Sequence, residues 1–147
     1  MALIYKGSNE SWGLIAILLH WILAGLLFVQ FASGIRLSTL NFSATKLELI
    51  DTHQSIGSLI MILVFVRFFW RINNTKPSNK TLPTFHSLIS YITHMMVYLL
   101  LFSIPLLGFF YNWLSDLDII LFGVITIPNI ILIENDEIAD VLIEIHF

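Results

Sequence analysis

The chain has 147 residues, of which 57% are hydrophobic and only 12% are charged, and its mean hydropathy is +0.87. A soluble domain carries about 25% charged residues, so a water-facing surface could hardly be covered with this supply. The net charge of −3 argues against nucleic acid as a partner. The absence of cysteine excludes disulfides and thiolate-bound metals. The composition therefore predicts an integral membrane protein.

Three apolar segments are long enough to cross a hydrocarbon core of about 30 Å. They cover about residues 12–35, 54–72 and 88–113, and only the second contains basic residues. We expect one all-α membrane domain over residues 1–147, a transmembrane helical bundle with three spans and a fourth missing at the C-terminus. Residues 114–147 would hold an outer loop and the start of a final helix.

The apolar run over residues 117–133 does not predict a fourth span, because Asp118, Pro128 and Asn129 interrupt it. We expect this stretch to be a loop at the membrane interface. Apolar residues then recur at helical spacing, which predicts that a helix begins near the end of the chain. They are Ile138, Val141, Leu142 and Ile145.

Basic residues predict the orientation of the bundle, because they are enriched on the cytoplasmic side. Five of them lie near the N-terminus or the second loop, against two in the first loop. This count favours a cytoplasmic N-terminus, with the first span retained as an anchor. The five are Lys6, Arg67, Arg71, Lys76 and Lys80, and the two are Arg36 and Lys46.

Histidines within or beside the spans are the candidate functional residues, because ionisable groups in a membrane are costly. His20 and His94 lie at similar depths in the first and third spans, whereas His53 and His146 lie on the opposite side, and His86 lies in a loop boundary. The spans lack the carboxylates of a proton relay, and a bare metal ion needs a tighter cluster. Two depths favour two haems, each ligated by imidazoles from facing helices.

Each of these residues has a simpler interpretation as well. His53 could mark the membrane boundary, and His94 could be a packed histidine bonded to a neighbouring helix, which is the interpretation we favour for it. Arg67 and Arg71 share one helix face and suit the carboxylates of haem propionates, although Arg71 could also be a basic membrane anchor. Small residues could let a flat macrocycle approach, although glycine is common in membrane helices. They are Gly25, Gly34, Ser55 and Gly57.

The ordered pattern resembles the bacterial cytochrome b561 family, which is related to the cytochrome b subunit of nickel–iron hydrogenase. The resemblance is carried by LLHWILAGLLFVQFASG in the first span, HQSIGSLIMILVFVRFFWR in the second and HMMVYLLLFSIPLLGFFYNW in the third. LFGVITIPN and IADVLIEIH match the outer loop and the start of the family's fourth helix. The match follows the expected order over nearly the whole chain.

The resemblance implies two b-type haems. His20 would ligate the haem nearer the cytoplasm, and His53 and His146 would ligate the outer haem, with His94 a less favoured ligand that could line a haem edge or a quinone site. The family's fourth helix supplies a second, deeper histidine. This chain ends at Phe147, before any such residue. We therefore expect a truncated member of the family.

The implied function is electron transfer in the bacterial inner membrane, between the quinone pool of a respiratory chain and a donor or acceptor at the outer face. Oxidation of superoxide coupled to quinone reduction is implied by the resemblance only. Two alternatives stay open. The chain could be a haem-bearing membrane anchor that acts through a dehydrogenase or hydrogenase subunit, or a truncated remnant that holds no stable cofactor.

Overall fold

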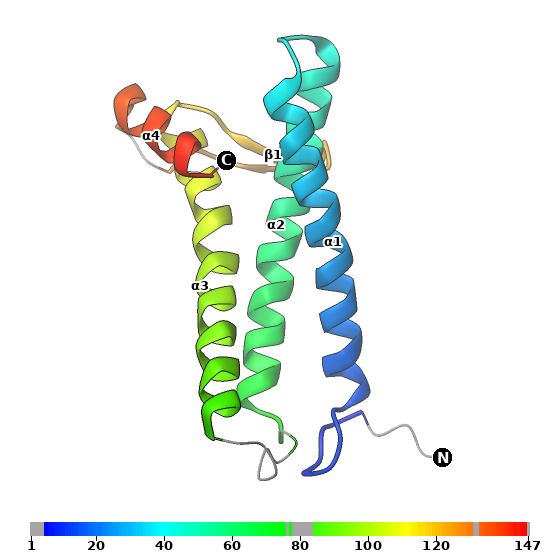
Figure 1. Cartoon of the computed structure of the whole chain (residues 1–147). Helices are drawn as coiled ribbons and strands as arrows, with labels where there is room; N and C mark the ends of the chain where they lie inside the picture. The colour runs from blue at the N-terminus through cyan, green and yellow to red at the C-terminus, as the bar shows by residue number, and fades with distance from the viewer. Residues whose placement is uncertain (1–4, 76, 78–83, 131–132, 147) are drawn as a thin grey trace.

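The computed structural model describes residues 5–75, 77, 84–130 and 133–146. Three long helices run side by side, with a short hairpin and a short fourth helix at one end (Figure 1). The helices are α1 (Leu14–Thr39), α2 (Ala44–Ile72), α3 (Thr84–Leu114) and α4 (Asp136–His146), and the strands are β1 (Ile119–Leu121) and β2 (Ile125–Ile127).

The three long helices are each long and apolar enough to cross a membrane, which confirms the three predicted spans. They contain 26, 29 and 31 residues, so the shortest is about 39 Å long at 1.5 Å per residue. α4 has 11 residues and is about 16 Å long, which is too short to span. α2 begins at Ala44, well before residue 54, because the Ser43 hydroxyl accepts the Lys46 N–H at 3.2 Å and caps the helix.

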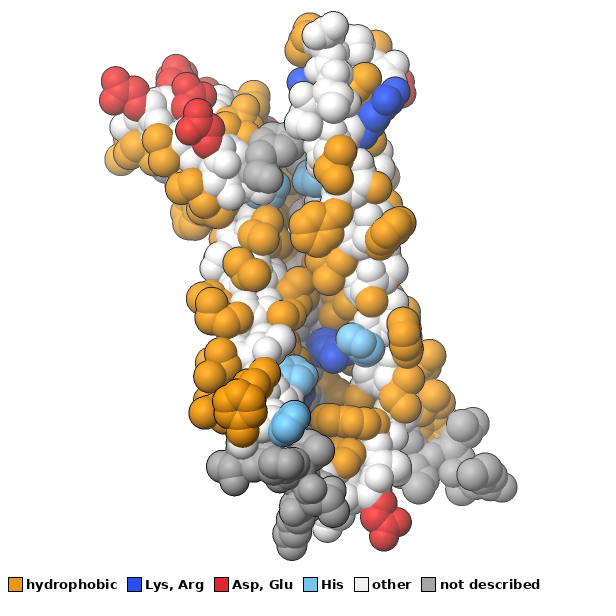
Figure 2. Space-filling model, viewed as in Figure 1, with side chains coloured by type: hydrophobic (Ala, Val, Ile, Leu, Met, Phe, Trp, Pro, Cys, Tyr) orange, Lys and Arg blue, Asp and Glu red, His pale blue; other side chains and the backbone are white. Residues whose placement is uncertain are grey.

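The core lies where α2 packs against α1 and α3. Leu23, Ile60 and Val64 are buried there. Most other large apolar side chains are exposed and cover the visible outer faces of the long helices (Figure 2). Such faces are expected of helices that lie in lipid, where the backbone is satisfied within each helix and apolar side chains face outward. The partly buried residues around the core are Leu26, Leu27, Ile56, Leu63, Tyr98, Leu101 and Phe102.

The prediction of a loop over residues 117–133 is wrong for its first part, which forms an antiparallel hairpin of β1 and β2. The paired residues alternate between buried and exposed in β1, with Ile119 and Leu121 buried. The turn places Phe122 and Gly123 at φ +53° and +67°, the left-handed values that a tight hairpin turn requires.

The hairpin is attached to α2 through Ser55. The buried Ser55 hydroxyl accepts the Phe122 N–H at 2.8 Å and donates to the Asp51 carbonyl at 2.7 Å. One hydroxyl thus satisfies the backbone of a strained turn residue and fixes β1 against α2. We call the end of the bundle that carries the hairpin and α4 the α4 end (Figure 1). The opposite end, near the N-terminus, is called the Lys6 end.

α4 begins at the position expected from its sequence and packs against α3. The Asn135 side chain accepts the Ile138 N–H at 3.0 Å, and the Asn135 N–H donates to the Leu114 carbonyl at 3.0 Å. Asp136 and Glu137 in the first turn complement the positive end of the helix dipole. His146 lies at the C-terminal end of α4.

Candidate functional site

His53 and His146 lie face to edge at the α4 end. Their ring centroids are 5.9 Å apart with an interplanar angle of 76°, although one residue belongs to α2 and the other to α4. Two imidazoles that ligate one metal ion from opposite sides have centroids roughly 6 Å apart, since the metal–nitrogen bonds are about 2 Å long. The structure thus brings together the two histidines that the sequence assigned to one haem.

A serine of α1 fixes the tautomer of His53. The Ser33 hydroxyl has one proton, which it donates to the Gln30 carbonyl at 2.8 Å. At its 2.8 Å contact with His53 Nδ1 the same hydroxyl must therefore accept. The proton of a neutral His53 then lies on Nδ1, and the ring carries its lone pair on Nε2, the atom that a metal would bind.

His146 is oriented in the same way by α3. Its Nδ1–H donates to the Ile104 carbonyl at 2.8 Å, so the lone pair of the neutral ring lies on Nε2. The ring also lies against Gly108, where an added Cβ would be 3.2 Å from His146 Cε1. Histidine ligands of metals commonly donate from their second nitrogen to a carbonyl or a similar acceptor, which fixes tautomer and orientation.

Amide side chains connect the three long helices at the level of this histidine pair. Gln30 of α1 donates to the His53 carbonyl at 2.9 Å. Gln54 of α2 donates to the buried Asn112 Oδ1 at 2.8 Å, and Asn112 in turn donates to the Gly108 carbonyl at 2.8 Å. Both histidines are therefore held by neighbouring elements that are themselves linked. Polar residues inside apolar spans are a signal that could have identified these amides from the sequence.

The small residues chosen from the sequence contribute unequally. An added Cβ at Gly34 would lie 3.6 Å from His53 Cε1, so this glycine does border the histidine. Ser55 and Gly57 do not border open space, because Ser55 is covered by the hairpin and a Cβ on Gly57 would lie 3.1 Å from the Gln30 amide. Gly108, which contacts His146, was not chosen from the sequence.

A second group of histidines lies toward the Lys6 end, and Figure 2 shows pale-blue side chains at these two levels. His20 lies within electrostatic range of Arg67 and His94. The side chains of His20 and His94 are both exposed. The prediction that His94 bonds a neighbouring helix is wrong, because its Nδ1–H donates to the carbonyl of Ser90, one turn earlier on α3, at 2.6 Å.

The two arginines of α2 differ in their surroundings. Arg67 Nη1 is buried and has no hydrogen-bond partner among the described residues. A buried cationic donor within a span is costly, and a carboxylate would satisfy it. Arg71 instead lies over the Tyr98 ring, with its guanidinium carbon 5.9 Å from the ring centroid, at the outer limit of a cation–π contact. Of the two, Arg67 therefore has the chemistry expected of a propionate partner.

The fold is that of a helical membrane protein with three candidate spans, and it brings His53 and His146 together at one end. A sequence model of the prokaryotic cytochrome b561 family matches residues 11–147. Cytochrome b561 homolog 2 of Escherichia coli (strain K12) is 28% identical over 128 residues, which cover 84% of this chain and 67% of that protein. The chain therefore belongs to the prokaryotic cytochrome b561 family. This membership confirms the resemblance and indicates a membrane b-type haem protein of electron transfer.

Proposed function

We propose that the chain carries electrons through haem b between the quinone pool and a donor or acceptor at the outer face of the bacterial inner membrane. His53 and His146 would hold the iron of one haem at the α4 end. The observation that carries this assignment is the 5.9 Å separation of their ring centroids, together with Nδ1 contacts that leave the lone pair of each neutral ring on Nε2. Retention of the N-terminus on the cytoplasmic side, expected from the basic residues, would place this pair near the outer face.

The chain's residues fit such a cofactor in two respects. Ser33 and the Ile104 carbonyl orient the two imidazoles, and glycines lie where a side chain would meet either ring. When bound, a haem held by these two imidazoles would supply one-electron redox chemistry. The protein sets the orientation of the ligands and the polarity around them.

The Lys6 end would hold the second haem, with His20 as one of the residues that would bind it. Arg67 is the proposed partner of a propionate, because its buried Nη1 has no partner among the described residues. His94 acts electrostatically on His20 and its Nδ1 donates to a backbone carbonyl, so His94 remains the less favoured candidate for a second residue that would hold this haem.

The test is the haem content of the full chain purified from membranes, with a reduced-minus-oxidised spectrum. We expect His53→Ala and His146→Ala each to remove the same haem, because the two residues share one iron. His86→Ala is the matched control, since His86 is exposed and its described ring contact is with Phe85. A haem content unchanged by His53→Ala would overturn the assignment, and a wild-type chain without haem would support the remnant interpretation instead.

The quinone part of the proposal needs its own measurement. The haem-loaded chain in lipid vesicles should be reduced by a lipid-soluble quinol, and the rate should fall when the haem at the Lys6 end is lost through His20→Ala. If the quinol leaves the haems oxidised while a small-molecule reductant reduces them, the electron donor is not a quinol.

A further inference from the structure

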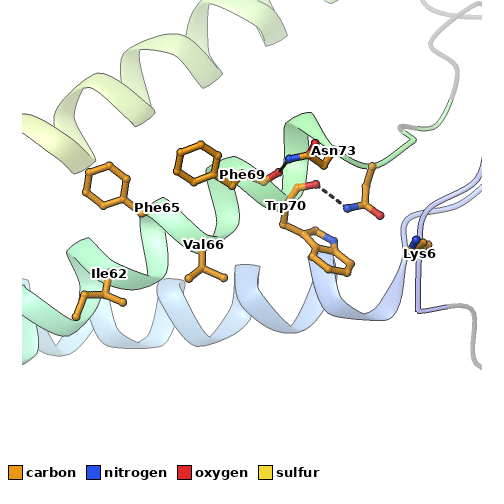
Figure 3. A pocket seen from close by; sticks show the side chains of 8 residues that line it. Lys6, Ile62, Phe65, Val66, Phe69, Trp70 and Asn73 are labelled. Atoms are coloured by element: carbon orange, nitrogen blue, oxygen red, sulfur yellow. Dashed lines mark hydrogen bonds between the residues drawn. The ribbon is translucent and has the colours of Figure 1, made fainter.

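A groove that the proposed electron transfer does not use lies on α2 at the Lys6 end. It is open to the outside, with a volume of about 640 Å³. The residues that line it in the spanning part of α2 are apolar, and Lys6, Asn73 and Asn74 line it near the end of the helix (Figure 3). Phe65, Val66 and Phe69 form the apolar wall, and Trp70, Asn74 and Lys6 line the groove toward the end of the helix.

The groove changes from apolar to polar along the direction in which the long helices run. Phe65, Val66 and Phe69 belong to the candidate span, so the apolar wall lies beside lipid chains. Asn74 follows the end of α2, and its side chain donates to the Trp70 carbonyl at 2.8 Å. A ligand that fits must therefore have an apolar part along the span and a polar head near the membrane boundary.

The polar end of the groove presents hydrogen-bond donors and a positive charge. Trp70 Nε1 is a buried donor with no partner among the described residues, and leaving such a group unpaired is costly. Lys6, the basic residue of the lining, borders the same groove. None of the described residues that line it is acidic. The missing group is therefore an acceptor that carries negative charge.

We propose that this groove binds an anionic phospholipid, with an acyl chain along Phe65, Val66 and Phe69 and the phosphate near Trp70 Nε1 and Lys6. A quinone would supply a carbonyl acceptor but no charge for the Lys6 ammonium, so the charge favours the phospholipid. Basic residues between helices at a membrane boundary are a known basis for binding anionic head groups. The site does not depend on haem binding, because it lies outside the histidine groups.

The test uses the full chain in nanodiscs that contain a small fraction of brominated lipid, since bromine quenches tryptophan fluorescence on contact. Brominated phosphatidylglycerol should quench more than brominated phosphatidylcholine. Trp70→Phe should abolish this difference, and Lys6→Gln should weaken the preference for the anionic lipid about fivefold. Trp21→Phe and Arg36→Gln are controls that keep the preference, because Trp21 is exposed elsewhere on α1 and Arg36 is near its opposite end.

Competition in the wild-type chain makes the test independent of whether the variants fold. Unlabelled phosphatidylglycerol should restore the fluorescence, and unlabelled phosphatidylcholine should not. Equal quenching by the two brominated lipids would overturn the proposal. So would a preference that survives Trp70→Phe, or displacement by a neutral lipid-soluble quinone but not by phosphatidylglycerol, which would make the groove a quinone site.

Discussion

Replacing Gly108 with alanine tests whether His146 acts as a ligand from the position that the structure gives it. The His146 ring lies against the α3 backbone at Gly108, with its Nδ1–H bonded to the Ile104 carbonyl at 2.8 Å. An added Cβ would lie 3.2 Å from Cε1 and 3.5 Å from Nδ1. The first distance is shorter than the ordinary contact range, which begins at 3.4 Å, so the ring must shift by a few tenths of an ångström.

The shift acts on the cofactor rather than on the helix. Alanine within a helix is favoured over glycine by about 0.5–1 kcal/mol, so α3 itself should not be weakened. The displaced ring, however, must weaken either its bond to the Ile104 carbonyl or a metal–nitrogen bond of about 2 Å. Loss of such an orienting contact typically costs 10- to 100-fold in metal affinity. We expect haem affinity at the α4 end to fall about 10-fold, the lower limit of that range.

The assay is haem titration of the purified apoprotein, followed by absorbance, with His146→Ala as the reference for complete loss of this ligand. Gly25→Ala is the matched control, because an added Cβ there meets nothing within 4 Å. Gly25→Ala should keep wild-type haem affinity and gain a little helix stability. The reasoning is refuted if Gly108→Ala and Gly25→Ala bind haem equally well, since His146 would then not ligate from its place beside Gly108.

Three further changes test the contacts around the histidines. Ser33→Ala removes the acceptor of the His53 Nδ1–H and should lower haem affinity at the α4 end about 10- to 100-fold in the same titration, with Ser33→Thr restoring it. Gln54→Leu leaves the buried Asn112 Oδ1 without its donor and should destabilise the bundle by about 1–2 kcal/mol in detergent unfolding; unchanged stability would show that the link is dispensable. Arg67→Gln removes a cation that favours the more negative, reduced state, so a redox titration should show a lower potential for the haem at the Lys6 end alone.

The membrane spans could be predicted from the sequence because lipid imposes a strong condition on composition. Apolar runs of sufficient length with few or no charges are rare by chance, and the structure places a helix at each of them. The start of α2 at Ala44 was missed, since Lys46, Glu48 and Asp51 are polar residues that hydropathy assigns to a loop. The Ser43 cap was the readable signal for that start.

The hairpin could not be predicted in the same way. A short apolar run has no periodicity that separates a strand from a buried loop, and β1 and β2 contain three residues each. The turn depends on Phe122 at a positive φ, which a bulky residue rarely adopts. What satisfies its N–H is the hydroxyl of Ser55, a residue of α2 that is distant in the sequence.

The same limit applies to the site. His53 and His146 were paired through the family resemblance, and the structure brings them together. Ser33 and Gly108 were not foreseen as their neighbours, because helical periodicity gives the face on which a residue lies but not the residue that it meets on another helix. Asn112 was detectable in principle, since a buried amide inside an apolar span requires a partner.

The contacts of the histidine pair at the α4 end orient both rings, which supports the proposed cofactor site there. His53 is positioned by a hydroxyl from α1, and His146 by a carbonyl from α3, so each ring is oriented by a helix other than its own. His94 is instead held within its own helix, which fixes its tautomer but not its distance from another helix. A site whose ligands are already oriented avoids part of the entropic cost of ordering them. For this reason variants of His53 and His146 at the α4 end test the electron-transfer proposal more directly than variants of His20.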